Sequence, residues 1–276
     1  MRTIGIVLAV AVALGAARVH GQQPQGEIKG SASVHTEASL AASVASAALV
    51  LPARATGSAL FAGKLADAPP AAARVPVVIF VHGSSGLGLA AIGEWQRWLA
   101  SLGVASVAPD SFALPDRITY TSPVDKATYE KIHAMRAAEI DAALAAVKRQ
   151  PWADPARIVL AGTSEGSVAV ARYAGGGISG RIVYAWSCEP NYFVTQPRNG
   201  FGPDEPVLNV ISAVDPFFSP SNPWLGNPSA RGHCAEALRG DKNAVIVLIP
   251  GAPHTLINLP AARNATAAFV ADVLKP

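Results

Sequence analysis

The sequence predicts a three-layer α/β domain, in which helices flank both faces of a mostly parallel central sheet. Short apolar runs rich in β-branched residues alternate with helix-like segments from residue 75 to the C-terminus. Gly, Pro and Asp residues separate these segments at regular intervals. Half of the 276 residues are apolar and 15% are charged, which is typical of a folded domain with a large core.

The segments before residue 75 are the least regular. Residues 22–55 read as an Ala- and Ser-rich lead-in with weak periodicity, and residues 47–54 within it are a candidate first edge strand. A second strand is expected within residues 59–70, before a turn of Pro and Ala. We therefore assign the globular domain to residues 56–276.

From residue 75 onward, strands and helices alternate. The run VPVVIFVHG at 75–83 is continuously apolar, as expected for a strand buried on both faces of a parallel sheet. A helix over 90–103 follows and ends at Gly103. The remaining expected strands are 104–110, 157–162, 181–187, 206–215 and 244–254, and the remaining expected helices are 125–150, 167–175, 232–240 and 261–275.

The pentapeptide GTSEG at 162–166 lies between an expected strand and an expected helix. Glycines suit such a junction because the turn is sharp and a Cβ would clash with the packed helix. The helix N-terminus behind Ser164 adds positive partial charge. Because the chain contains 24 glycines, the pentapeptide alone is weak support, but its position predicts that Ser164 is a nucleophile.

A serine nucleophile needs a general base, and His254 is the best candidate. It follows the last expected strand, where loops at the carboxyl ends of parallel strands gather the working residues. The alternative is a buried histidine with a structural role. The other histidines are His20 and His35 near the N-terminus, His133 with an exposed or capping role, His82 before a glycine, and His233 at an expected helix start.

The acid that orients this base is expected to be Asp215. It ends its strand and lies between Ser164 and His254, which gives the order Ser, Asp, His along the chain. Asp110 also ends a strand, but precedes Ser164, so we interpret it as a capping or turn residue.

Two backbone N–H groups are expected to form an oxyanion hole. The loop HGSSG at 82–86 follows an early strand and offers the N–H of Ser84, and Glu165 offers the second N–H. The Glu165 side chain is then free to make a polar contact elsewhere. The alternative is that 82–86 is only a flexible loop.

Two aromatic segments follow strand ends, at 189–206 and 215–233. Their rings could form an apolar substrate pocket, or could cover the core beneath long loops. The candidate pocket residues are Tyr192, Phe193, Phe217, Phe218 and Trp224.

The N-terminus predicts a signal peptide over residues 1–21. Arg2 precedes an apolar stretch from Ile4 to Ala17, and Val19 and Gly21 are small residues before a cleavage site. About 14 apolar residues are too few for a membrane anchor, which is the alternative interpretation. We expect a secreted or periplasmic protein without stable membrane insertion after cleavage, and in an oxidising compartment Cys188 and Cys234 should form a disulfide.

Charge and composition exclude several other functions. Without residues 1–21 the formal charge falls from +3 to +1, with 20 basic against 19 acidic side chains, so nothing favours nucleic acid binding. No His, Cys and Asp cluster has metal-ligand spacing, and we expect neither metal nor cofactor. The sequence does not determine the oligomeric state.

The segments VVIFVHGSSG, APDSFALPDR, PARIVLAGTSEGSVA, NVISAVDPF and IPGAPHTL together resemble the α/β-hydrolase superfamily, and especially secreted relatives of dienelactone hydrolase. The resemblance spans residues 58–276 and implies an α/β-hydrolase fold with a Ser-His-Asp triad. Dienelactone hydrolases use a cysteine nucleophile, whereas this chain has Ser164.

This difference favours a general serine esterase that cleaves carboxylic esters through an acyl-enzyme, so lactone specificity is not implied. A peptidase or amide hydrolase of the same fold is the enzymatic alternative. A non-catalytic binding protein that retains the fold is the alternative from another class.

Overall fold

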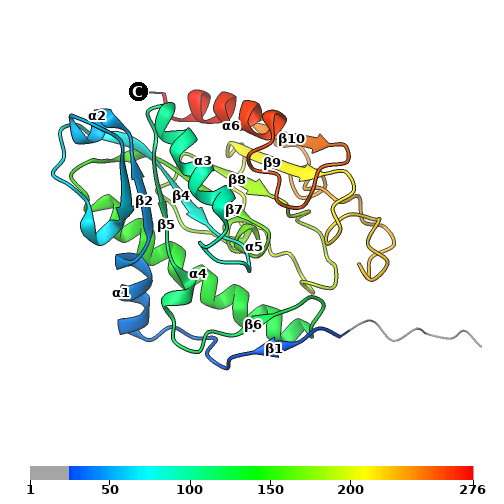
Figure 1. The fold of residues 1–276 in the computed structure, drawn as a ribbon. Helices are drawn as coiled ribbons and strands as arrows, with labels where there is room; N and C mark the ends of the chain where they lie inside the picture. The colour runs from blue at the N-terminus through cyan, green and yellow to red at the C-terminus, as the bar shows by residue number, and fades with distance from the viewer. Residues whose placement is uncertain (1–24, 276) are drawn as a thin grey trace, which may run out of the picture.

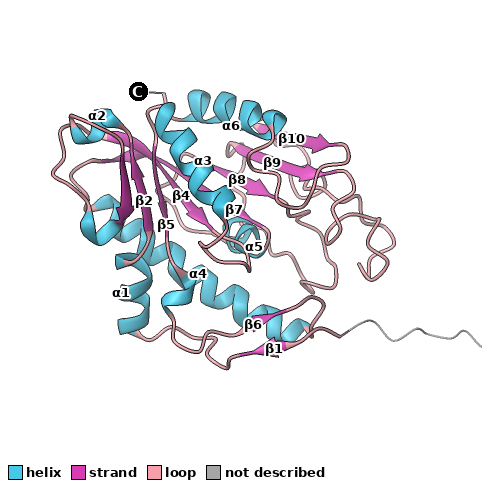
Figure 2. Ribbon diagram, in the orientation of Figure 1, coloured by secondary structure: helices cyan, strands magenta, loops and turns pink. Residues whose placement is uncertain are grey.

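The computed structural model describes residues 25–275, and shows helices on both faces of a central sheet (Figure 1). The eight strands of this sheet run in the order β10-β9-β8-β7-β4-β5-β2-β3. The three-layer α/β architecture is therefore confirmed (Figure 2). Within residues 25–275 no helix has the length and apolar character to cross a membrane, and the expected signal peptide at 1–21 lies outside the described residues.

The order of elements follows the expected alternation. The strands are β1 (Ile28–Lys29), β2 (Ala48–Leu51), β3 (Phe61–Lys64), β4 (Val75–Val81), β5 (Ala105–Ala108), β6 (Thr119–Tyr120), β7 (Ala153–Thr163), β8 (Gly180–Tyr184), β9 (Val207–Ser212) and β10 (Ala244–Ile249). The α-helices are α1 (Glu37–Ala45), α2 (Ala53–Thr56), α3 (Ala90–Ser101), α4 (Lys126–Lys148), α5 (Glu165–Arg172) and α6 (Pro260–Val273).

The strands β5, β4, β7, β8, β9 and β10 pair in parallel, so their carboxyl ends meet at one edge of the sheet. In the central pair, Val81 at the end of β4 lies beside Gly162 near the end of β7. This register brings the loops that follow the two strands together.

The N-terminal segment is more ordered than its sequence indicates. Helix α1 and strand β2 form within the expected lead-in, so its interpretation as weakly structured is wrong for residues 37–51. The strand expected at 47–54 forms as β2, but it is not an edge strand, because it pairs antiparallel with both β3 and β5 and β3 lies at the edge. Thr36 caps α1 by accepting the N–H of Ser39.

The helix expected at 232–240 does not form, and the segment consists of turns. The Cys234 N–H donates to the buried Asn209 side chain on β9 at 3.0 Å, and its sulfur is bonded to Cys188. Gly232 and Gly240 have φ of 77° and 86°, outside the helical region. These tertiary contacts outweigh the local helix preference.

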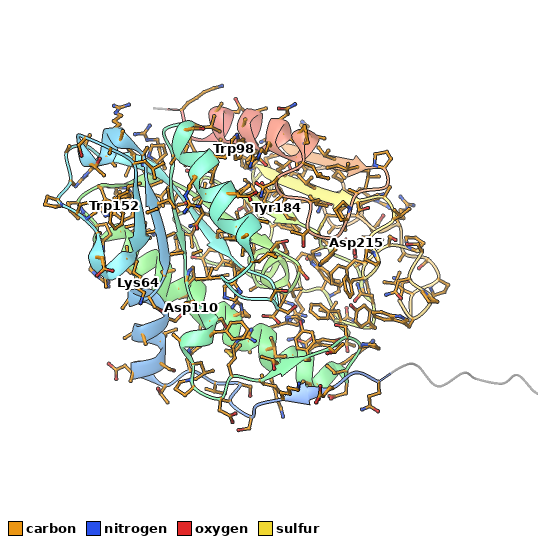
Figure 3. All side chains as sticks on the ribbon, in the orientation of Figure 1. Lys64, Trp98, Asp110, Trp152, Tyr184 and Asp215 are labelled. Atoms are coloured by element: carbon orange, nitrogen blue, oxygen red, sulfur yellow. A yellow bond between two sulfur atoms is a disulfide. The ribbon has the colours of Figure 1, made fainter. Side chains whose placement is uncertain are left out.

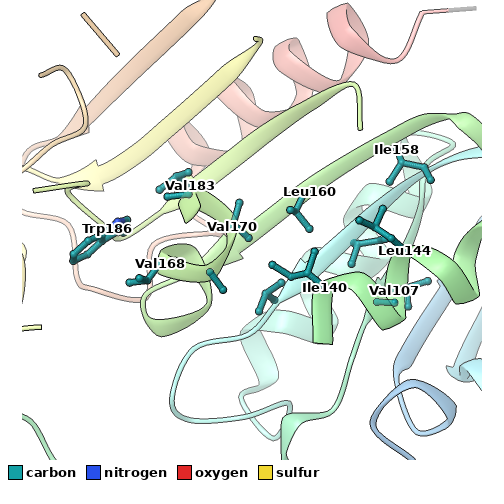
Figure 4. Close-up of a cluster of buried hydrophobic side chains, with 14 of the residues drawn as sticks. Val107, Ile140, Leu144, Ile158, Leu160, Val168, Val170, Val183 and Trp186 are labelled. Carbon is teal, nitrogen blue, oxygen red and sulfur yellow. The ribbon is translucent and has the colours of Figure 1, made fainter. Parts of the chain in front are cut away.

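The core lies on both faces of the sheet. Strand β4 is buried along its length except for Pro76. Helices α4 and α5 pack on one face, where Ile140, Leu160 and Val168 belong to the same cluster (Figure 4). Helices α3 and α6 pack on the other face, through residues that include Trp95 and Phe269.

The disulfide expected between Cys188 and Cys234 is present and joins positions 46 residues apart. We expect the double variant C188A/C234A to lose about 4 kcal/mol of unfolding free energy, because closing a loop of this length restricts the unfolded chain. Urea unfolding with and without reductant measures the loss. Equal midpoints for wild type and variant under oxidising conditions would contradict this expectation.

Candidate active site

Ser164 occupies a sharp turn between β7 and α5. Its backbone has φ 53° and ψ −119°, a conformation that residues other than glycine rarely adopt. Such strain costs about 1–3 kcal/mol and persists only where the surroundings enforce it. Here the Ser164 N–H donates to the carbonyl oxygen of Tyr184 on β8 at 3.0 Å, and helix α5 begins at the next residue.

Close packing explains the two glycines of the pentapeptide. A Cβ on Gly162 would lie 2.8 Å from the carbonyl carbon of Gly166, and a Cβ on Gly166 would lie 2.1 Å from the Val81 carbonyl oxygen. Helix α5 therefore packs directly against the ends of β7 and β4. The sequence pattern correctly indicated a tight strand-to-helix turn with the serine at its tip.

Asp215 and His254 form a hydrogen-bonded pair at the same edge of the sheet. Asp215 is fully buried in the loop after β9 (Figure 3), and its Oδ2 lies 2.8 Å from His254 Nδ1. Its Oδ1 accepts the N–H groups of Phe217 and Phe218 at 2.9 and 3.0 Å. The carboxylate is therefore fixed, and it orients the imidazole with Nδ1–H as donor and Nε2 as the free nitrogen.

A cavity of about 150 Å³ lies at this edge of the sheet, and both Ser164 and His254 line it. Within residues 25–275 their side chains make no hydrogen bond to each other, and such bonds often tighten only when substrate binds. Tyr192, Phe193, Phe217 and Phe218 line the cavity as expected, but Trp224 does not. Instead, the Trp224 ring packs behind the wall, 4.5 Å from the Tyr192 ring.

The loop at 82–86 lies against this cavity and is anchored by a buried histidine. His82 Nδ1 donates to the Gly83 carbonyl oxygen at 2.7 Å, and its Nε2 accepts the Ser111 N–H at 3.2 Å. Burial, followed by the positive charge of Arg136, lowers the pKa of His82 well below its usual value. In the described part of the chain, the N–H groups of Ser84 and Glu165 have no protein acceptor.

The Glu165 side chain points away from the cavity into a set of buried charges. Its carboxylate accepts from Arg117 Nη2 at 2.6 Å and from the Tyr120 hydroxyl at 2.9 Å. Arg136 lies beyond them and pairs with Glu139 at 3.1 Å. The expected polar contact of Glu165 is thus an ion-pair network of four charged side chains.

A family model for the dienelactone hydrolase family matches residues 61–270. The chain belongs to the dienelactone hydrolase family. It is therefore a hydrolase of the α/β-hydrolase superfamily, in agreement with the resemblance of its motifs. A search of curated proteins found no match.

Solved structures share the fold of this dienelactone hydrolase family member. A Klebsiella pneumoniae protein described as a candidate dienelactone hydrolase has a TM-score of 0.53 at 20% identity, covering 74% of this chain and 90% of its own. Esterase PE8 gives 0.52 at 18%, with 82% and 97% covered. The metagenomic dienelactone hydrolase-like promiscuous phosphotriesterase P91 gives 0.51 at 17%, with 78% and 92% covered.

The cavity residues of this hydrolase that the sequence analysis missed include two with hydroxyl groups, Tyr120 and Ser122. Tyr120, on β6, and Ser122 line the cavity from the segment between β5 and α4. They could have been found from their position after the carboxyl end of β5, because ligand sites in parallel sheets gather residues from the segments that follow the strands. Asp110, at the start of this loop, accepts the Phe112 N–H at 2.9 Å, as expected of a capping residue.

Three histidines, His35, His233 and His133, differ from their expected roles. His35 is buried, and its Nε2 lies 2.9 Å from Glu139 Oε1. His233 accepts the Ala235 N–H in a turn rather than at a helix start. Among the described residues, no group of three or more His, Cys, Asp or Glu side chains is arranged to hold a metal.

His133 is neither exposed nor a cap, because it is buried on α4. Its Nε2 donates to the Phe193 carbonyl oxygen at 3.2 Å, beneath the aromatic wall of the cavity. Burial, followed by the positive charge of Arg172, lowers the pKa of His133 to about 4. The imidazole therefore stays neutral at pH values where an exposed histidine gains a proton.

This pKa predicts a loss of stability in mild acid. Between pH 6.5 and about 4 the unfolded chain binds a proton at His133 that the folded chain does not, so stability falls as the pH falls. The full loss is about 3 kcal/mol. Urea unfolding from pH 7 to 4 should show a shallower decline for His133→Gln, and parallel curves would contradict the assignment.

Proposed function

We propose that this dienelactone hydrolase family member is a serine esterase that uses Ser164 as nucleophile, His254 as base and Asp215 as the acid that orients it. The observation that carries this proposal is that Ser164 and His254 line one cavity, while buried Asp215 holds His254 at 2.8 Å. The serine lies at a strained strand-to-helix turn, which exposes its hydroxyl to that cavity.

The proposed reaction has two steps. His254 Nε2 accepts the Ser164 proton as the hydroxyl oxygen attacks the ester carbonyl, and the N–H groups of Ser84 and Glu165 hold the resulting oxyanion. The carbon–oxygen bond then breaks, and His254 gives its proton to the leaving alcohol. Water attacks the acyl-enzyme by the same route and releases the carboxylic acid.

The size and lining of the cavity favour small acyl groups. Its volume of about 150 Å³ is small for a ligand pocket, which favours short acyl groups. The rings of Phe193, Phe217 and Phe218 line it, which favours an apolar chain.

A panel of p-nitrophenyl esters and aminoacyl anilides tests the proposed substrate class. We expect kcat/KM to be highest for acetyl or butyryl esters and at least about tenfold lower for octanoyl, since each misplaced methylene costs about 1 kcal/mol. Faster cleavage of the anilides would instead establish the amide hydrolase. Binding without hydrolysis of any member would identify a non-catalytic protein.

We also propose that residues 1–21 direct export, and that the esterase domain expected over residues 56–276 also includes β2, because β2 pairs with β3 and β5 inside the central sheet. The buried disulfide supports export, because disulfides persist in oxidising compartments. Expression of the full chain with mass analysis of the mature protein tests this. A mature N-terminus at Gln22 is expected, and retention of residues 1–21 on exported protein would contradict cleavage.

A further inference from the structure

The two expected oxyanion donors, the N–H groups of Ser84 and Glu165, lie far apart in the sequence. One buried side chain, that of Arg136, contacts the neighbourhood of both. Ser84 belongs to the loop after β4, whereas Glu165 begins α5. Arg136, fully buried on α4, contacts His82 on the first side and Glu165 on the second. Helix α4 lies close to both β4 and α5 (Figure 1).

The contact with the first loop has two parts. Arg136 Nη2 donates to the His82 carbonyl oxygen at 2.8 Å, and Nη1 lies 3.2 Å from His82 Nε2. The His82 ring in turn donates to the Gly83 carbonyl oxygen. The guanidinium therefore fixes both the backbone and the ring of the residue that precedes Gly83 and Ser84.

The contact with the second donor is an ion pair. Arg136 Nε lies 3.7 Å from Glu165 Oε1, and this N–H has no other partner among the described residues. Arg117 and Tyr120 bind the same carboxylate directly. Glu165 is the first residue of α5, and its backbone N–H is the expected second donor. An ion pair that holds the Glu165 carboxylate therefore also holds the position of this N–H.

A buried arginine destabilises the fold unless its partners offset the cost of removing its charge from water. Removing a guanidinium from water costs several kcal/mol, and an apolar side chain would pack at the same interface without that cost. The charges balance locally, because Arg117 and Arg136 face Glu139 and Glu165. The planar fork reaches two loops at once, which the single ammonium of a lysine does not.

We propose that Arg136 is a positioning residue, which sets the separation between the Ser84 and Glu165 N–H groups that receive the oxyanion. This proposal rests on the proposed serine esterase function. Arg136 touches no substrate, since it does not line the cavity. Its effect therefore reaches the reaction through the His82 loop and the start of α5.

The variant Arg136→Lys, with Arg181→Lys as control, tests the proposal in the full-length protein. Arg181 is equally buried and pairs with Glu205 at 2.7 Å, but it lies at the opposite end of β8 from the cavity. We expect Arg136→Lys to lower kcat by about 10- to 100-fold with KM little changed, less than the loss of a whole donor. Arg181→Lys should leave kcat within about twofold.

Thionoesters separate positioning of the oxyanion hole from a general structural effect. The sulfur of a thiocarbonyl accepts hydrogen bonds poorly, so an intact oxyanion hole favours the oxygen ester over the matched thionoester. We expect this preference in kcat/KM to fall about tenfold in Arg136→Lys and to stay unchanged in Arg181→Lys. A purely structural role would slow both substrates equally.

A second variant covers the case in which Arg136→Lys does not fold. Arg136→Gln with Glu139→Gln removes one cation and one anion, so the remaining Arg117 and Glu165 stay balanced. Circular dichroism and urea midpoints establish folding, and the same fall in ester preference is expected. An unchanged preference in a folded variant overturns the proposal.

Ser164→Ala, assayed in parallel, separates failure of the Arg136 proposal from failure of the proposed serine esterase function. If Ser164→Ala is inactive and the Arg136 variants keep the wild-type ester preference, the positioning role alone is wrong. If Ser164→Ala keeps wild-type activity, the serine esterase function itself is wrong.

Discussion

We expect Ser164→Ala to lower kcat for ester hydrolysis by about 10⁶-fold, because the acyl-enzyme cannot form without the hydroxyl. KM should change little, since the cavity wall is intact. The fold should also be retained, because alanine carries the same Cβ at the strained φ of 53°. Steady-state and single-turnover assays on p-nitrophenyl acetate measure the loss.

Ser167→Ala is the matched control for this variant. Ser167 lies in the first turn of α5, just after Ser164, and is buried outside the cavity. Its hydroxyl donates to the Tyr184 carbonyl oxygen. Its loss should cost about 1 kcal/mol of stability while kcat stays within about threefold. Equal activity of the two alanine variants would contradict the role of Ser164.

Asp215→Asn should lower kcat by about 10⁴-fold, the second largest effect expected. The amide oxygen can still accept the N–H groups of Phe217 and Phe218, so the loop keeps its shape. The amide nitrogen then faces His254 Nδ1 and favours the tautomer with a proton on Nε2. With a proton already on Nε2, His254 cannot accept the Ser164 proton.

Asp110→Asn is the control for the change of acid to amide. Asp110 also accepts the N–H of the residue two positions ahead, Phe112, and it lies at the start of the loop that follows β5. Asparagine preserves this cap, so activity should stay within about threefold. Rates measured over pH 6 to 9 separate a lost triad contact from a shifted optimum. If Asp215→Asn retained more than about a tenth of the wild-type rate, the triad assignment would be wrong.

The main elements of the fold could be predicted because their signals are local. Continuous apolar runs such as 75–81 form strands buried on both faces, and each helix between them ends near a turn residue. Residues 37–51 and 232–240 were misjudged because distant partners decide their structure. β2 forms through pairing with β3 and β5, and the 232–240 turns through Asn209 and Cys188.

The candidate triad could be located because each member follows the carboxyl end of a parallel strand. The buried charges around Glu165 could not, since their geometry depends on how α4 packs. One signal existed in retrospect: Ile132, Arg136, Glu139 and Ala143 share a face at helical spacing, and all four are buried. Charged residues on an apolar face indicate a buried network rather than a solvated one.

The most direct test of the serine hydrolase assignment is labelling with a fluorophosphonate, followed by peptide mapping. We expect one adduct per chain on Ser164, slower labelling of Asp215→Asn, and none on Ser164→Ala. Such reagents form a stable bond only with an activated serine, so the adduct reports nucleophile, base and oxyanion hole together. No adduct on the native protein, or one that persists in Ser164→Ala, would contradict the assignment.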